Sequence, residues 1–419
     1  MATSTQKKAM SYDSLRTILS HLEPNLRLQV ADQVRETRAA DKTLPMKIDN
    51  LSFSNAFICL NDTKYQLGII RKNRKGPNPS IINFLNNRGG LQQELNRFGL
   101  EDDELEMATT PGDIVLKDQA FGARRSTIEQ QQRRLEDRQR DLRKLLDRKA
   151  ALDEGQVFNY AEAQGPVNGF GRAPQSPEEQ RESLTKTSPD GTKYIERFNY
   201  NQNLAAAQKY MMTKILGNRY ATPNIKSLGI HALPYEPMVL RLPVGLKLRS
   251  QNLSTSGKFS ETLKRLKPIL EDLDRTYRNL GVEYFDLEDC AHPLIQTAKT
   301  LAIYNVANMA VLRAITNKEV EIINGTMEDS VDYGALIGHW RETGGREVGT
   351  CFKFQMLDER KAEKALADVK TRYNDAVEGE RLLILPLSNS AQIKSSYEAL
   401  PEENRDRQRW LLQIEVVPI

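Results

Sequence analysis

Short apolar strand patterns recur along the C-terminal half of the chain, and they constrain the fold more than any other feature. They centre on Leu228, Leu246, Tyr284, Leu301 and Val320. Leu246 follows Leu228 by 18 residues and Val320 follows Leu301 by 19, with helical or irregular segments between the patterns. A strand and a connector in each interval predict either an ordinary α/β domain with a parallel sheet or leucine-rich-like solenoid units. The sequence leaves these two alternatives open.

The end of the chain predicts a small α+β cap. The stretch "VGTCFKFQM" reads as a strand and "DERKAEKALADVKTRYNDA" as a helix, and the strands "RLLILPL" and "WLLQIEVVPI" follow. We therefore expect residues 193–419 to form one C-terminal α/β domain, in a chain whose overall class is mixed α+β and α/β.

The N-terminal residues 10–45 predict a small helical module. Four apolar residues fall at i, i+3, i+4 and i+7, which is the spacing of one stripe along a helix. The proline that follows ends this helix and suits the first turn of a second one. The candidate docking residues of the module are Leu15, Ile18, Leu19, Leu22, Pro24, Leu26 and Leu28.

Three further segments separate this module from the C-terminal domain. Residues 46–121 predict a small α+β segment that begins with short strands. Residues 122–152 predict a long inserted helix with ten Lys/Arg against five Asp/Glu; the interleaved charges favour a solvated helix, with a dimeric coiled coil as the alternative. Residues 153–192, rich in Gly, Pro, Ser and Gln, predict a flexible linker.

The residues that could perform chemistry are scattered along the sequence. Cys290 and His292 form the only close Cys/His pair, and two ligands do not make a zinc site. We expect a buried structural cysteine and a helix-capping histidine there. The sequence has no phosphate-binding glycine loop and no nucleophile elbow. The prediction is therefore a non-enzymatic protein with no catalytic residue, metal or cofactor.

Composition limits the partners and the compartment. No run approaches the roughly 18 apolar residues of a membrane span, so no membrane partner is expected. The basic segment lacks interleaved aromatic residues, which argues against nucleic acid as a partner. Three widely separated cysteines suit a reducing compartment, so we expect a cytoplasmic or nuclear protein.

The stretch "SYDSLRTILSHLEPNLRLQV", Ser11 to Val30, resembles an F-box. The resemblance lies in the apolar stripe of the first helix, the break at Pro24, and the opening of the second helix with Leu26, Arg27 and Leu28. The stretches "LPMKIDNLSF", "NDTKYQLGIIRK", "LRLPVGLKL" and "YGALIGHWRETGGREVGT" are similar to the nematode F-box proteins that carry an F-box-associated domain of unknown function.

This resemblance implies a substrate adaptor of a cullin-type (SCF) ubiquitin ligase. The helical module would bind a Skp-type adaptor, which bridges it to the cullin, and the C-terminal domain would bind a protein substrate that the sequence does not identify. An exposed apolar stripe of this kind is stable when a partner helix or groove covers it. The alternative is a binding or inhibitory, antidote-like protein without coupling to a ligase.

Overall fold

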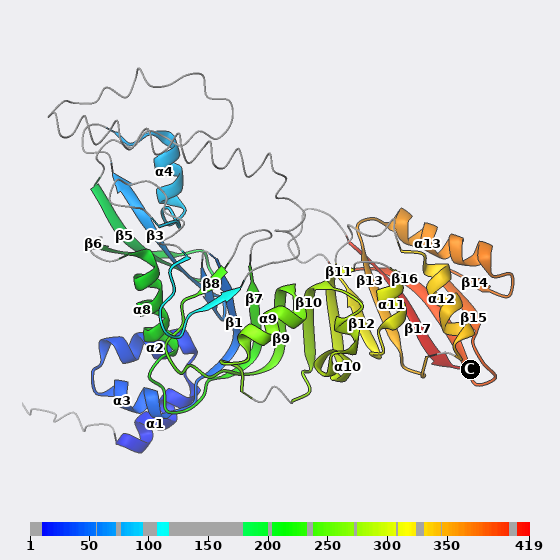
Figure 1. Ribbon diagram of the computed structural model, residues 1–419, viewed down its shortest axis with the longest axis horizontal. Helices are drawn as coiled ribbons and strands as arrows, with labels where there is room; N and C mark the ends of the chain where they lie inside the picture. Colours follow the sequence, from blue (N-terminus) through cyan, green and yellow to red (C-terminus); the bar gives the residue numbers. More distant parts are fainter. Residues whose placement is uncertain are drawn as a thin grey trace, which may run out of the picture. The chain divides into compact units, whose positions relative to one another are not determined.

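The computed structural model describes residues 11–55, 57–72, 77–94, 107–116, 179–199, 203–232, 238–271, 275–306, 309–323, 331–344, 346–401 and 409–419. The predicted basic helix over 122–152 lies outside these residues. The chain forms two compact units (Figure 1). The first unit contains the described residues up to Pro223 together with those of Ala232–Leu246; the second contains Asn224–His231 and the described residues of Lys247–Ile419.

The first unit begins with three short helices, α1 (Tyr12–His21), α2 (Pro24–Gln33) and α3 (Thr37–Thr43). The Ser11 side chain accepts a hydrogen bond from the backbone N–H of Ser14 and so caps α1. α2 starts at Pro24, where a missing N–H is harmless because the first turn of a helix has no internal acceptor for it. The predicted helical module is confirmed in this part of the chain.

An antiparallel sheet follows the helices in the first unit. Its strands are ordered β1 (Lys47–Ser54), β2 (Ile58–Leu60), β3 (Thr63–Lys72), β5 (Glu179–Thr187) and β6 (Lys193–Asn199). The unit also contains α4 (Ser80–Asn87), α8 (Leu204–Leu216) and a ribbon of β4 (Ile114–Leu116) and β8 (Met238–Leu240). The short strands predicted from Met46 onward are therefore present as β1, β2 and β3.

The flexible linker predicted over 153–192 is wrong for its last part. Residues 179–187 form β5, which pairs with β3 along its whole length, and residues 188–192 turn the chain into β6. The sequence concealed this strand because its buried face carries Ser183 and Thr185, small polar residues rather than apolar ones. Backbone hydrogen bonds to β3, rather than burial of apolar side chains, stabilise this strand. Residues 153–178 lie outside the described residues.

The predicted boundary of the C-terminal domain also moves. Residues 193–223 and 232–246 belong to the first unit, so a continuous domain over 193–419 does not form. β6 pairs with β5 of the first unit, and α8 packs beside β3. These tertiary contacts join segments that are far apart in sequence, so composition along the chain did not mark the boundary.

Two buried carboxylates hold α8 in the first unit. Glu94 accepts a hydrogen bond from the backbone N–H of Ala205, in the first turn of α8, at 2.5 Å. Asp113 lies between Lys209 of α8, at 2.9 Å, and Arg241, at 3.2 Å. Burial acts to raise the pKa of Asp113, but the hydrogen bonds from Lys209 and Thr110 hold it below its usual value.

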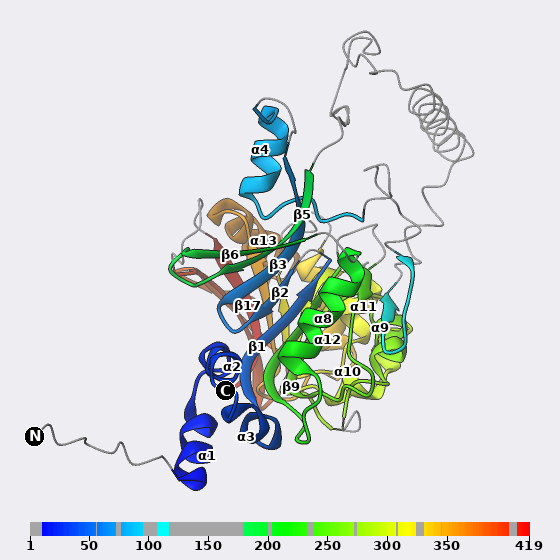
Figure 2. The same ribbon diagram turned by 90° about the vertical axis from the view of Figure 1, so that its left-hand side faces the viewer.

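The second unit is a mixed α/β sheet. Its parallel strands follow one another in sequence order: β7 (Asn224–His231), β9 (Arg249–Lys258), β10 (Asn279–Phe285), β11 (Thr300–Val306), β12 (Glu319–Ile322) and β13 (Cys351–Met356). The connectors hold α9 (Phe259–Leu266), α10 (Pro293–Thr297), α11 (Met309–Ala314) and α12 (Tyr333–Glu342). Figure 2 shows these four helices together on one side of the strands.

The alternation of strand and connector predicted from the sequence is thus present, with units of unequal length. The strand predicted around Leu246 is wrong in position: β9 begins at Arg249, and Leu253 lies opposite Leu228. Thr300 lies opposite Glu319, 19 residues later, whereas Glu319 lies opposite Cys351, 32 residues later. The sheet then continues with antiparallel strands, β17 (Trp410–Pro418), β16 (Ala391–Ala399), β15 (Leu382–Pro386) and β14 (Val377–Gly379). A helix that precedes them in sequence, α13 (Glu359–Arg372), packs on β16 and β17.

One row of apolar residues crosses seven strands of this unit and forms its core. Each member lies directly opposite the next in the strand register, and none is more than 1% exposed. The row consists of Leu228, Leu253, Leu280, Leu301, Val320, Phe352 and Ile414. Because neighbours along a strand point to opposite faces, the residues on either side of this row face away from the core. None of the described helices is long and apolar enough to cross a membrane.

Leu301→Ala should lower the free energy of unfolding by about 2–5 kcal/mol, because it leaves a cavity at the centre of this row. The matched control is Ala302→Ser, next along β11 on the opposite face, which should change it by less than about 0.5 kcal/mol. Urea unfolding followed by circular dichroism measures both. Equal destabilisation by the two substitutions would show that both faces of the sheet are core.

Candidate docking surface on the N-terminal helices

The apolar stripe of α1 mostly faces inward. Leu19 is fully buried in a small core with Ala40 and Leu44 of the α3 region. Three partly buried residues pack against that core: Leu15, Leu22 and Val30. The structure therefore brings together three of the predicted docking residues, Leu15, Leu19 and Leu22, but it uses them to join the three helices.

Other predicted docking residues face outward. Ile18 of α1 is 45% exposed and Leu26 of α2 is 46% exposed. Two further apolar side chains on this part of the chain are exposed, Tyr12 at 55% and Val34 at 42%, and neither is among the predicted docking residues. Large apolar side chains that remain in water are candidates for contact with another protein.

Pro24 and Leu28, the remaining predicted docking residues, are not exposed. Pro24 is buried at the first position of α2, and Leu28 is half-buried. The side chain of Glu23 caps this helix by accepting hydrogen bonds from the backbone N–H groups of Asn25, at 2.8 Å, and Leu26, at 3.1 Å. This cap fixes the start of α2 and with it the position of Leu26.

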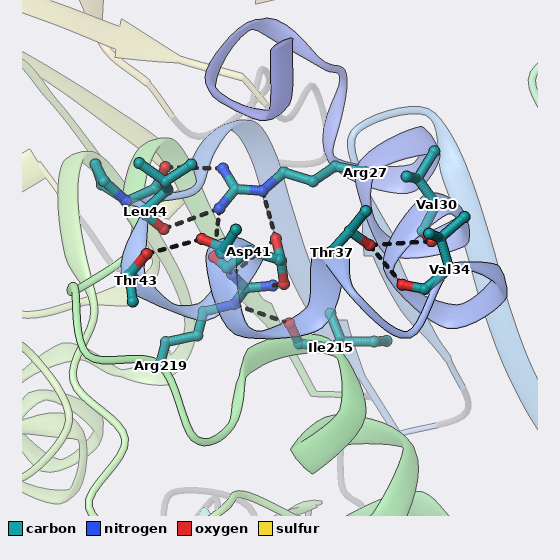
Figure 3. Close-up of polar contacts among 11 residues, drawn as sticks. Arg27, Val30, Val34, Thr37, Asp41, Thr43, Leu44, Ile215 and Arg219 are labelled. Atoms are coloured by element: carbon teal, nitrogen blue, oxygen red, sulfur yellow. Dashed lines mark hydrogen bonds and ion pairs between the residues drawn. The ribbon is translucent and has the colours of Figure 1, made fainter. Parts of the chain in front are cut away.

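A buried ion-pair cluster holds the three helices against the rest of the first unit (Figure 3). Asp41 of α3 accepts from Nε of Arg27 at 2.5 Å and from Arg219, which follows α8, at 3.0 Å. The remaining N–H groups of Arg27 reach the backbone carbonyls of Asp41, Leu44 and Pro45 at 2.6–3.0 Å. All three charged side chains are at most 5% exposed. Burial lowers the pKa of Arg219, and Asp41 opposes that shift.

A second polar cluster ties α2 to β2 and β3. Asn25 donates to the backbone carbonyl of Leu60 at 3.0 Å and accepts from the hydroxyl of Tyr65 at 2.7 Å. Burial, with the nearby charge of Glu23, raises the pKa of that tyrosine, so its hydroxyl keeps its proton at neutral pH and remains a donor. The helices are thus fixed to two different elements of the first unit while Ile18 and Leu26 stay exposed.

The Cys290 and His292 pair has the structural role that the sequence predicted. Cys290 is buried, and Nδ1 of His292 accepts from the backbone N–H of Leu294 at 3.2 Å, which caps α10. Burial raises the pKa of the Cys290 thiol. The described part of the chain holds no group of three or more His, Cys, Asp or Glu side chains able to bind a metal ion.

The comparison with known families concerns the middle of the chain. Residues 203–358 match a domain of unknown function (DUF3557). The matched stretch starts at the residue that caps α8 in the first unit and ends just after β13 in the second. It covers less than half of the chain and does not include the N-terminal helices. Neither the curated proteins nor the solved structures gave a match.

The sequence did not indicate the role of the charged residues that position the candidate surface. Arg27 stands between Leu26 and Leu28 and entered only through the F-box resemblance, Asp41 stands in a polar stretch, and Arg219 is 178 residues away from Asp41. A charged side chain in a short helix usually faces water. The available signal was the spacing of 14 residues between Arg27 and Asp41, which two adjoining helices can bring into contact, but nothing in the sequence distinguishes that pair from others.

Asp41→Asn should lower the free energy of unfolding by about 3–5 kcal/mol, because it leaves two buried guanidinium groups without a counter-charge. The control is Asp32→Asn, which removes a carboxylate paired with Lys214 on the surface, where both side chains are more than half exposed. That pair should contribute less than about 1 kcal/mol. Thermal and chemical unfolding test both variants; similar losses would mean that the buried cluster holds nothing in place.

Proposed function

We propose that this chain is a non-enzymatic substrate adaptor of a cullin-type ubiquitin ligase. The N-terminal helices would bind a Skp-type adaptor, and a surface further along the chain would bind the protein to be ubiquitinated. The observation that carries the proposal is the exposure of Ile18 and Leu26 on helices that polar clusters hold firmly in place. A preformed surface loses little conformational entropy when a partner binds.

The resemblance of Ser11–Val30 to an F-box supports this assignment, as does the three-helix form of the module. The match to a domain of unknown function agrees with the kind of domain that the nematode F-box-associated family carries, and we infer membership of that family. We further infer that the consecutive strand-and-connector units of the second unit act as leucine-rich-like units with an extended binding surface. Such a protein would work in the cytoplasm or the nucleus.

Binding of a purified Skp-type adaptor to the full chain tests the proposal. Ile18→Asp/Leu26→Asp should weaken it at least about 100-fold, because two carboxylates would be buried without partners in the complex, at several kcal/mol in total. Both positions are exposed, so the fold should survive, in contrast to Leu19→Asp, which would place a charge in the small core. Isothermal titration calorimetry gives the affinity, and circular dichroism checks the fold.

Val377→Asp is the matched control, since Val377 is a 65% exposed apolar residue in the second unit. It should leave adaptor binding unchanged. Unchanged binding by the Ile18→Asp/Leu26→Asp variant would remove these helices from the contact. If the reference chain does not bind the adaptor at all, the ligase role is wrong and an inhibitory, antidote-like binding protein becomes the better description.

A further inference from the structure

The face of the second unit's sheet that lies opposite its core row is partly exposed and carries many charged and polar side chains, together with apolar ones such as Leu411 and Ile384. In β12, Val320 and Ile322 are buried, whereas Glu319 is exposed and Glu321 is half-buried. The same alternation continues in β13, where Lys353 projects from the face opposite to that of its buried neighbours. We call this the open face.

Strand register shows that the helices share the other face. The ring of Phe352 meets Trp340 of α12 edge to face, with ring centroids 5.1 Å apart. Phe354, on the same face as Phe352, lies opposite Leu412, and Leu412 lies opposite Tyr397. The hydroxyl of Tyr397 reaches Glu363 of α13, so α12 and α13 cover one face.

The helices between the parallel strands follow the same rule. Parallel crossovers are right-handed almost without exception, and these strands advance across the sheet in sequence order, so all of their connecting helices fall on one side. Figure 2 shows α9 to α12 on that side. Among the described elements of this unit, no helix covers the open face.

The open face is acidic although the whole chain carries a net charge of +4. Its negatively charged side chains are Glu283, Glu319, Glu321, Glu398 and Glu415, and its positively charged ones are Lys353, Lys394 and Arg409, which donates to Gln355 of β13. Five glutamates against three basic side chains leave an excess of two negative charges. A sheet face with this excess, in a chain of the opposite sign, complements a positively charged partner.

Several of these glutamates bond to neutral groups. Glu319 accepts from the hydroxyl of Thr300 at 2.8 Å, and Glu415 accepts from the amide of Gln413 at 3.1 Å. Neither bond cancels a charge, although Lys394 lies directly opposite Glu415, and Lys353 directly opposite Glu321, in the strand register. Cys351 lies between them in the register: burial raises the pKa of its thiol to about 11, Lys353 opposes this shift, and Glu415, Glu319 and Glu321 add to it.

We propose that the open face binds a segment of a partner protein that presents several lysine or arginine side chains. Neighbouring strands are about 4.8 Å apart, so the six strands from β10 to β16 span about 24 Å, which suits about seven residues of extended chain. The inference rests on the proposed function and deepens it, because this surface would hold the protein to be ubiquitinated.

The test uses the full chain and a fluorescent peptide of about twelve residues in which lysine alternates with threonine. Glu319→Gln/Glu321→Gln keeps the size of the side chains and one acceptor oxygen in each but removes two charges, and it should weaken binding at least about tenfold. The control, Glu342→Gln/Asp368→Asn, removes two exposed charges from α12 and α13. The affinity of this control variant for the lysine peptide should stay within about twofold of that of the reference chain. A peptide with glutamine in place of lysine should bind at least about tenfold more weakly to the reference chain. Fluorescence anisotropy measures all of these affinities.

If the two charge variants weaken peptide binding equally, the affinity depends only on the net charge of the chain, and the proposal would be wrong. Equal binding of the lysine and glutamine peptides would also overturn it. The Ile18→Asp/Leu26→Asp variant separates this proposal from the ligase role. It should bind the peptide like the reference chain, so a failure of adaptor binding and a failure of the open face are observed with different ligands.

Discussion

The first unit depends on buried carboxylates that converge on α8 and the residues that follow it. Asp41 meets Arg219 just beyond the C-terminal end of the helix, Asp113 meets Lys209 in its middle, and Glu94 meets the backbone at its start. Each contact joins α8 to a different segment of the chain. A buried charge that loses its partner is strongly destabilising, so these contacts specify which segments must lie against α8.

This arrangement separates the two roles of the N-terminal helices. The apolar residues that gave the F-box resemblance are divided between an inner part, centred on Leu19, and an outer part that includes Ile18 of α1 and Leu26 of α2. The inner residues bury apolar area and keep the helices together. The outer residues are free to bury further apolar area against a partner. Arg27 makes four hydrogen bonds that join α2 to α3 and to the residues that follow it, so the outer residues are carried on helices with fixed partners.

The second unit shows a comparable division between the two faces of one sheet. The core row is almost wholly inaccessible to water and packs under helices, while the opposite face carries glutamate, lysine and small polar residues. A strand can serve both purposes because its side chains alternate at every residue. Core packing fixes the strand order and register, and the register in turn places charges from separate strands side by side. Glu319 and Glu415, 96 residues apart in sequence, become neighbours of Cys351 in this way.

The sequence by itself determined the local elements and their apolar faces. The spacing of Leu15, Leu19 and Leu22 predicted the first helix, and the patterns around Leu228, Leu301 and Val320 predicted buried strands, because helical and strand periodicities are written directly into neighbouring residues. It missed β16, where buried Ser395 interrupts the apolar pattern, and β5, whose buried face is Ser and Thr. Only the tertiary structure decided which distant segments pair, that Arg219 meets Asp41, and which glutamates gather on the open face. Those outcomes depend on backbone pairing and ion pairs between residues tens to hundreds of positions apart, and the local pattern of residues does not indicate such distant partners.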